Sequence, residues 1–277
     1  MSRALLALLF ALATSIAVLL GRDALFALLT RGTDVARGSE AVLEGCYRFA
    51  IYAPILLLAL LGCLLFRERP RAGGGASQIG AVLVVGLGAP AVLLAIAFLT
   101  GVAVPAAPFL QPVEPGLIVT GSLLIALQVA AEEMMFRGLL QPVLIRAGGR
   151  AAGIVLTALA FALVHFAGGW RDPASLANIF LAGLWFGLLA WRTGGLLAPI
   201  AAHFGYNWAE ELLFAASPNP GHGAFGSIFD VDLAGPAIWG GSVEGLNASL
   251  SLSVLLVLFI LPLVAGRARA GVVGAAA

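Results

Sequence analysis

Eight apolar segments, each close to the length of a membrane-spanning helix, restrict the fold of this chain more than any other feature. A helix that crosses a bilayer needs about 20 predominantly apolar residues. Apolar types make up 61% of the 277 residues and charged types only 10%, whereas soluble proteins carry about 25% charged residues. The sequence therefore predicts an all-α, polytopic membrane protein with about eight transmembrane helices. The segments are 4–20, 46–66, 79–104, 117–143, 151–169, 174–191, 196–216 and 249–265.

These segments suggest a division of the chain into three parts. Residues 1–116 contain the first three helices, residues 117–216 the next four, and residues 217–277 an outer loop and the last helix. The first segment follows Arg3 but lacks a clear cleavage site, so we expect a transmembrane helix rather than a signal peptide. The loop 217–248 is long and rich in Gly and Pro, which is typical of an irregular segment or a lid.

The net charge argues against a nucleic-acid-binding protein, and the cysteine spacing argues against a disulfide bond. The net charge is +1, and all 15 basic residues are arginines, which argues against nucleic-acid binding. Cys46 and Cys63 are 17 positions apart, roughly 25 Å on one helix, and we expect them to remain unpaired. In the sixth segment, the GxxxG pattern at 183–187 indicates close helix packing.

Arginines in alternate loops predict the orientation. The loops 67–75 and 146–150, the position after the sixth segment and the end of the chain carry arginines, whereas 105–116 and 217–248 carry only acidic charges. The positive-inside rule then places both termini in the cytoplasm. With an Ala-, Gly- and Arg-rich composition, this predicts a multi-pass protein of a bacterial inner or plasma membrane. The basic residues are Arg67, Arg69, Arg71, Arg146, Arg150, Arg192, Arg267 and Arg269.

Polar side chains interrupt three of the apolar segments. A charge at the bilayer centre costs about 2.5–3.5 kcal/mol on insertion scales, so such groups usually have a function. We expect Glu210 and Glu211 to be structural residues or to lie at the rim, and Arg48 to snorkel to an interface. The interrupting residues are Glu132, Glu133 and Arg137 in the fourth segment, His165 in the fifth, and His203 and Asn207 in the seventh.

Helical spacing predicts that these groups meet. Glu133 and Arg137 are i,i+4, the favourable order for an ion pair, and His203 and Asn207 share a helix face. With 1.5 Å per residue, the candidate residues lie roughly 11–21 Å from the cytoplasmic ends of their helices. We therefore expect one intramembrane cavity. A glutamate there can act as general base toward water, and His and Asn can stabilise an oxyanion. Glu132, His165 and His203 could instead bind zinc, although HExxH is absent.

The same residues carry a resemblance to a known family. EEMMFR matches EExxxR, FALVH matches FxxxH, and HFGYN matches HxxxN. In this order, on separate helices, the three motifs resemble those of the CPBP family of intramembrane proteases. That family includes type II CAAX prenyl endopeptidases and abortive-infection and bacteriocin-immunity proteins. The resemblance covers residues 117–211.

The resemblance implies an eight-span helical fold with a site open toward the cytoplasm. It implies that Glu132 activates water with help from His165, and that His203 and Asn207 form the oxyanion site. Arg137 would orient the glutamates, supported by Glu133. We favour a glutamic mechanism without a cofactor, with zinc as the alternative. The expected partner is a membrane-anchored or lipidated protein in the bilayer.

Two other functions compete with an intramembrane endopeptidase. A family member could act without catalysis, as an immunity or scaffold protein, although binding alone needs no water-activating carboxylate. A proton-coupled transporter also places carboxylates and histidines in its spans. Transporters often have paired halves and broken helices, and the sequence indicates neither.

Overall fold

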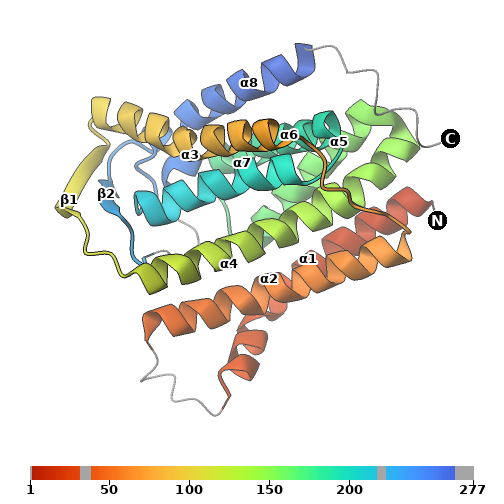
Figure 1. Ribbon diagram of the computed structural model, residues 1–277, viewed down its shortest axis with the longest axis horizontal. Helices are drawn as coiled ribbons and strands as arrows, with labels where there is room; N and C mark the ends of the chain where they lie inside the picture. Colours follow the sequence, from red (N-terminus) through yellow and green to blue (C-terminus); the bar gives the residue numbers. More distant parts are fainter. Residues whose placement is uncertain (1, 32–38, 217–222, 266–277) are drawn as a thin grey trace.

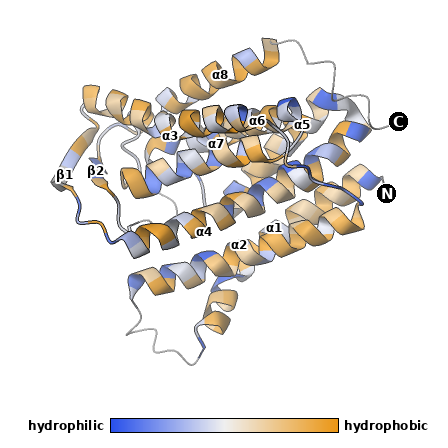
Figure 2. Ribbon diagram, in the orientation of Figure 1, coloured by the Kyte–Doolittle hydropathy of each residue, from blue (hydrophilic) through white to orange (hydrophobic). Residues whose placement is uncertain are grey.

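The computed structural model describes residues 2–31, 39–216 and 223–265, which form a bundle of helices (Figure 1). The predicted all-α class is confirmed, with one small sheet added. Hydrophobic residues run along most of each helix, and hydrophilic residues concentrate at helix ends and turns (Figure 2). The α-helices are α1 (Arg3–Leu29), α2 (Glu40–Leu65), α3 (Ala76–Leu99), α4 (Pro115–Glu133), α5 (Gln141–Gly168), α6 (Pro173–Thr193), α7 (Leu197–Trp208) and α8 (Leu250–Ala265).

Two π-helical segments continue α4 and α7. They are η2 (Met134–Leu140) and η3 (Ala209–Leu213), and each directly follows candidate site residues. π-Helical turns are rare and occur frequently at functional sites. The sequence analysis expected ordinary α-helices here, because the apolar pattern does not distinguish the two geometries.

Gly149 turns the chain back between the fourth and fifth predicted helices. Its backbone is non-helical inside α5, with φ 82° and ψ 170°, a conformation that favours glycine. The chain folds back so closely that a Cβ on Gly153 would lie 2.6 Å from the backbone nitrogen of Ile145. Residues 150–168 therefore form a separate helix.

Five helices of the described residues are long and apolar enough to cross a membrane. They are α1, α2, α3, the continuous segment Pro115–Gly168 and α6. That segment contains the turn at Gly149, while α7 with η3 and α8 are shorter. All eight predicted apolar segments lie largely in helices. The third was predicted too long, because the chain leaves α3 at Thr100 and Gly101 has φ 74°.

A two-stranded antiparallel sheet covers one end of the bundle. β1 (Ala103–Leu110) pairs with β2 (Phe229–Leu233), with Ala103 opposite Leu233. The described part of the predicted irregular loop, 223–248, therefore contains a strand and two 3₁₀ turns, η4 (Ala237–Trp239) and η5 (Gly245–Ala248). The sequence analysis missed this sheet because its two strands are far apart in the chain.

Glycines let the helices around the site approach closely. A Cβ on Gly86 of α3 would overlap the carbonyl oxygen of Ala202, and one on Gly205 of α7 would lie 2.8 Å from that of Leu83. On α6, a Cβ on Gly183 would lie 3.0 Å from Ala158 of α5. The close packing predicted from the GxxxG pattern is therefore present.

We predict that Gly86→Ala destabilises the protein. The added methyl group meets a backbone carbonyl that cannot rotate away, and such overpacking costs about 1–3 kcal/mol. Gly88→Ala on the same helix is the matched control, because a Cβ there meets nothing within 4 Å. Thermal denaturation in detergent should show a lower melting temperature for Gly86→Ala alone. Equal melting temperatures would contradict the close α3–α7 contact.

Candidate active site

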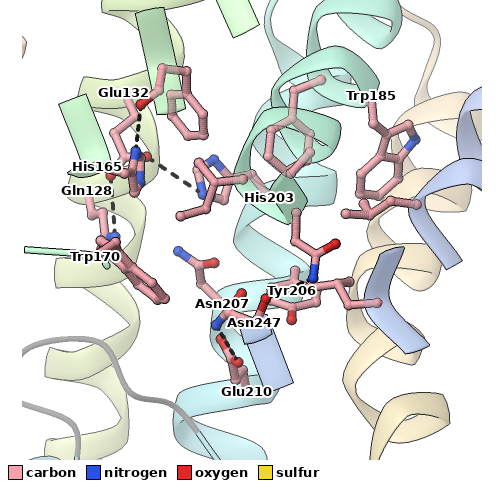
Figure 3. A pocket seen from close by; sticks show the side chains of 17 residues that line it. Gln128, Glu132, His165, Trp170, Trp185, His203, Tyr206, Asn207, Glu210 and Asn247 are labelled. Carbon is pink, nitrogen blue, oxygen red and sulfur yellow. Dashed lines mark hydrogen bonds and ion pairs between the residues drawn. The ribbon is translucent and has the colours of Figure 1, made fainter. Parts of the chain in front are cut away.

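Four of the predicted site residues line one cavity. Glu132 of α4, His165 of α5, and His203 and Asn207 of α7 surround a space of about 610 Å³, which includes its open mouth (Figure 3). The structure thus brings together side chains that are up to 75 positions apart in the chain. Glu133 and Arg137 lie behind this lining and are completely buried.

The Glu132 carboxylate faces the cavity with little support from other side chains. Gln128 Nε2 donates a long hydrogen bond of 3.4 Å to its Oε1. Its Oε2 is buried without a hydrogen-bond partner among the described residues and lies 3.8 Å from His203 Nε2. A buried carboxylate oxygen without a partner is costly, unless a water molecule or substrate group occupies the position beside it.

Glu133 binds two of the three cationic or potentially cationic groups of the site, Arg137 and His203. Its Oε1 accepts hydrogen bonds from Arg137 Nη1 and His203 Nδ1, both at 3.0 Å. Because a carboxylate only accepts, the proton of a neutral His203 is on Nδ1, and Nε2 faces Glu132. The predicted Glu133–Arg137 pair is therefore present, and it also fixes His203.

Arg137 is enclosed by backbone and aromatic rings. Its Nη2 donates to the carbonyl oxygen of Gly183 at 3.1 Å, which connects η2 to α6. The guanidinium carbon lies 4.6 Å from the ring centre of Phe161 and 5.4 Å from that of Phe186. Such cation–π contacts stabilise a desolvated guanidinium. Arg137 therefore positions Glu133 without reaching the cavity.

The two histidines are oriented by Phe161 and Phe186. His165 Nδ1 donates to the carbonyl oxygen of Phe161 at 2.9 Å, so the Nε2 of a neutral ring carries the lone pair. The ring of His203 stacks on Phe186 with 4.6 Å between centroids. Both imidazoles thus have fixed tautomers in their neutral forms, which a site for proton transfer requires.

The cavity wall contains polar residues that the sequence analysis did not assign to the site. Glu210 was expected to be structural or to lie at the rim; it is buried in the wall, where its Oε1 accepts a 2.9 Å hydrogen bond from Asn247 Nδ2. Asn178 Nδ2 donates to the carbonyl oxygens of Asn247 and Ser249. The i,i+3 spacing of Asn207 and Glu210 was a usable signal for Glu210. Asn247 lies in a turn without periodicity, so nothing in the sequence indicated it.

Arg48 does not snorkel, which corrects another prediction. It is 2% exposed, and it pairs with Glu211 and Glu44 at 2.6 Å each. Because Glu211 belongs to η3, this network connects α2 to the segment that carries Glu210. Arg48 is thus neutralised by acidic side chains inside the bundle. The prediction had placed its charge at the membrane interface.

The donor atoms do not form a zinc site in this arrangement. Among residues 2–31, 39–216 and 223–265, no three His, Cys, Asp or Glu side chains are placed to share a metal ion. Zinc holds its nitrogen and oxygen ligands at about 2.0–2.2 Å, and in the described part of the chain no third donor joins His203 Nε2 and Glu132 Oε2 to complete such a set.

Comparison with known proteins supports the resemblance seen in the motifs. Residues 114–209 match the family model of the type II CAAX prenyl endopeptidase Rce1-like proteins. This segment contains all three motifs and all six predicted site residues, so the resemblance to the CPBP family is confirmed there. No curated protein and no solved structure matches the chain.

We predict that Arg137→Met destabilises the protein strongly. Removing one partner of a buried pair leaves an uncompensated carboxylate, which costs about 3–5 kcal/mol. The matched control is Arg146→Met, because Arg146 pairs with Glu68 but is half-exposed, and exposed pairs contribute only about 0–1 kcal/mol. Denaturant titration in detergent compares the free energies of unfolding. Similar losses in the two variants would argue against a buried Glu133–Arg137 pair.

Proposed function

We propose that this chain, whose residues 114–209 form a CPBP-family domain, is an intramembrane endopeptidase that hydrolyses a peptide bond with water activated by Glu132. The Rce1-like family is a family of proteases, which supports peptide hydrolysis. The observation that carries the glutamic mechanism is the buried Oε2 of Glu132, a residue of the cavity lining, because this oxygen has no hydrogen-bond partner in the described part of the chain.

Glu132 and His165 would prepare the nucleophile. A water molecule beside Glu132 Oε2 donates one hydrogen bond to this oxygen and the other to His165 Nε2. Glu132 then takes a proton while the water oxygen forms a bond to the carbonyl carbon of the substrate. General-base assistance of this kind contributes about 10²–10⁴-fold to a rate. The proton on Glu132 later passes to the amine nitrogen as the C–N bond breaks.

His203 and Asn207 would stabilise the oxyanion that forms on the carbonyl oxygen. The side-chain amide of Asn207 supplies one N–H donor. His203 can donate from Nε2 to this oxygen in its imidazolium form, while its Nδ1 stays bound to Glu133 Oε1. Donors that are already oriented before the reaction are among the largest contributions to catalysis. Glu133 and Arg137 are positioning residues in this scheme.

The proposed enzyme is an integral membrane protein with eight crossings and both termini in the cytoplasm. Five helices meet the length and hydropathy criteria, and the turn at Gly149 with the shorter α7 and α8 supplies the remaining crossings. A membrane-anchored or lipidated protein is the proposed substrate, because only such a substrate is held near a buried site. Arg267 and Arg269, which contributed to the predicted orientation, lie outside the described residues.

We predict that Glu132→Gln abolishes cleavage of a membrane-anchored substrate. The amide keeps the shape of the side chain but cannot take a proton, so the rate should fall by about 10²-fold or more. Glu114→Gln is the matched control, since Glu114 is exposed at the start of α4. Purified variants in liposomes would be tested against tagged substrates that include a prenylated CAAX peptide and C-terminal anchor tails. Unchanged cleavage by Glu132→Gln would overturn this mechanism.

We also predict that a chelator leaves the activity unchanged. In the proposed mechanism the nucleophile is generated by Glu132 and His165 alone, so removal of divalent metal should not slow cleavage. The measurement is the cleavage rate after dialysis against EDTA or 1,10-phenanthroline, with a known zinc protease treated in parallel. Loss of activity that returns on addition of Zn²⁺ would instead support the zinc alternative with Glu132, His165 and His203.

A further inference from the structure

The helix ends form two groups at opposite ends of the bundle (Figure 1). We call the first the arginine-rich end; it comprises the start of α1 and residues 66–75, 146–150 and 192–196. Glu68 accepts hydrogen bonds from Arg3 and Arg146 there, and the Leu196 N–H donates to the carbonyl oxygen of Arg71. These contacts connect four separate turns.

We call the opposite group the sheet end; it comprises β1, β2 and residues 169–172 and 234–249. Arg22 near the end of α1 donates to the carbonyl oxygen of Gly168. The backbone N–H groups of Arg171 and Asp172 donate to Glu244, which joins the α5–α6 turn to the last loop. The sheet itself connects the end of α3 to this group.

The two ends differ in charge. Among the described residues, the arginine-rich end carries Arg3, Arg67, Arg69, Arg71, Arg146, Arg150 and Arg192, with Glu68 as its acid. The helix ends and loops on the sheet side carry Arg22, Arg31 and Arg171, with Asp23, Glu40, Glu44, Glu114, Asp172, Asp230, Asp232 and Glu244. Excess arginine marks the cytoplasmic side of a membrane protein. The sheet end therefore belongs on the non-cytoplasmic side.

The cavity extends from the middle of the bundle to the sheet end. Trp170 in the α5–α6 turn and Asn247 in η5 line it, and both are only partly buried. Asn178 lies in the second turn of α6 and Glu210 in η3, which are also close to this end. On each helix the lining residues thus reach toward the sheet end.

Packed side chains close the cavity toward the arginine-rich end. On η2 the residues beyond Glu132 include Leu139 and Leu140, which are both completely buried. Gln141 donates to the carbonyl oxygen of Gly187 at 3.0 Å, which joins α5 to α6 below the cavity. On α7, Ala198 and Ala202 fill the same level with no exposed surface. Among the residues that the structure describes, none that lines the cavity belongs to the arginine-rich end.

We infer that the cavity opens to water on the non-cytoplasmic side of the membrane. The resemblance to the CPBP family implied a site open toward the cytoplasm. The observed lining instead reaches the sheet end, and the arginines place the opposite end of the bundle in the cytoplasm. The inference about the substrate rests on the proposed protease function. If that function holds, the scissile bond lies in a segment on the non-cytoplasmic side. Membrane proteins with their cleaved segment outside the cytoplasm are then the substrate class.

Thiol labelling in bacterial cells that express the full-length protein tests this inference. Three single-cysteine variants are made after Cys46→Ala and Cys63→Ala: Ala182→Cys in the cavity, Val243→Cys at the sheet end and Ala147→Cys at the arginine-rich end. Val243 and Ala147 are exposed, and Ala182 lines the cavity. A small charged thiosulfonate that cannot cross membranes is applied to intact spheroplasts and to inverted vesicles. Thermal denaturation in detergent checks that each variant is folded.

We expect labelling of Ala182→Cys and Val243→Cys in spheroplasts, and labelling of Ala147→Cys only in inverted vesicles. Labelling of Ala182→Cys only from the side that labels Ala147→Cys would overturn the inference. So would reaction of Ala182→Cys only with a lipid-soluble maleimide, because the cavity would then open to lipid. Labelling of Ala147→Cys in spheroplasts would overturn the orientation. Labelling needs no catalysis, so these results are independent of the Glu132→Gln test of the proposed function.

Discussion

The Glu133 carboxylate is the acceptor on which the arrangement of the site depends. One oxygen receives both Arg137 of η2 and His203 of α7, and Arg137 in turn donates to α6. Three helical segments are thus held together by charge-assisted hydrogen bonds in the buried interior of the bundle. Such bonds are strong there, because a low dielectric environment raises the cost of leaving any partner unpaired. Breaking one contact would therefore release the orientation of His203 as well as the packing.

The position of α7 has a second cause in the glycines. Gly86 and Gly205 allow α3 and α7 to pack almost backbone to backbone. This contact fixes one side of α7. On the other side, His203 reaches Glu133, and the stacked ring of Phe186 limits its rotation. Packing thus sets the helix position, while hydrogen bonds set the side-chain orientation. Both are needed because a proton can pass between groups only when they are within hydrogen-bonding reach.

The sequence predicted the features that depend on local pattern. Apolar length predicted the helices, and i,i+4 spacing predicted the Glu133–Arg137 pair. Glu132, His165 and His203 line one cavity, as expected. Polar groups on apolar helices usually face the interior of the bundle, because exposure to lipid is costly. The β1–β2 sheet and Asn247 were missed, because they depend on contacts between segments more than 60 residues apart. Arg48 was misplaced for the same reason: its partner Glu211 is 163 positions away.

The charges of the site also give a role to its second carboxylate, Glu133, which is completely buried. In the proposed mechanism, a negative charge leaves the Glu132 carboxylate when it takes a proton from water, and a new one forms on the substrate oxygen. The total charge of the cavity does not change, so the cost of the step depends on how differently the protein solvates the two positions. Arg137, Glu133 and His203 form one connected group beside Glu132. In the proposed mechanism, Glu133 orients His203 toward the position of the oxyanion, while Arg137 holds Glu133 in place. Under this proposal, Glu133 determines where negative charge is stabilised although it does not line the cavity.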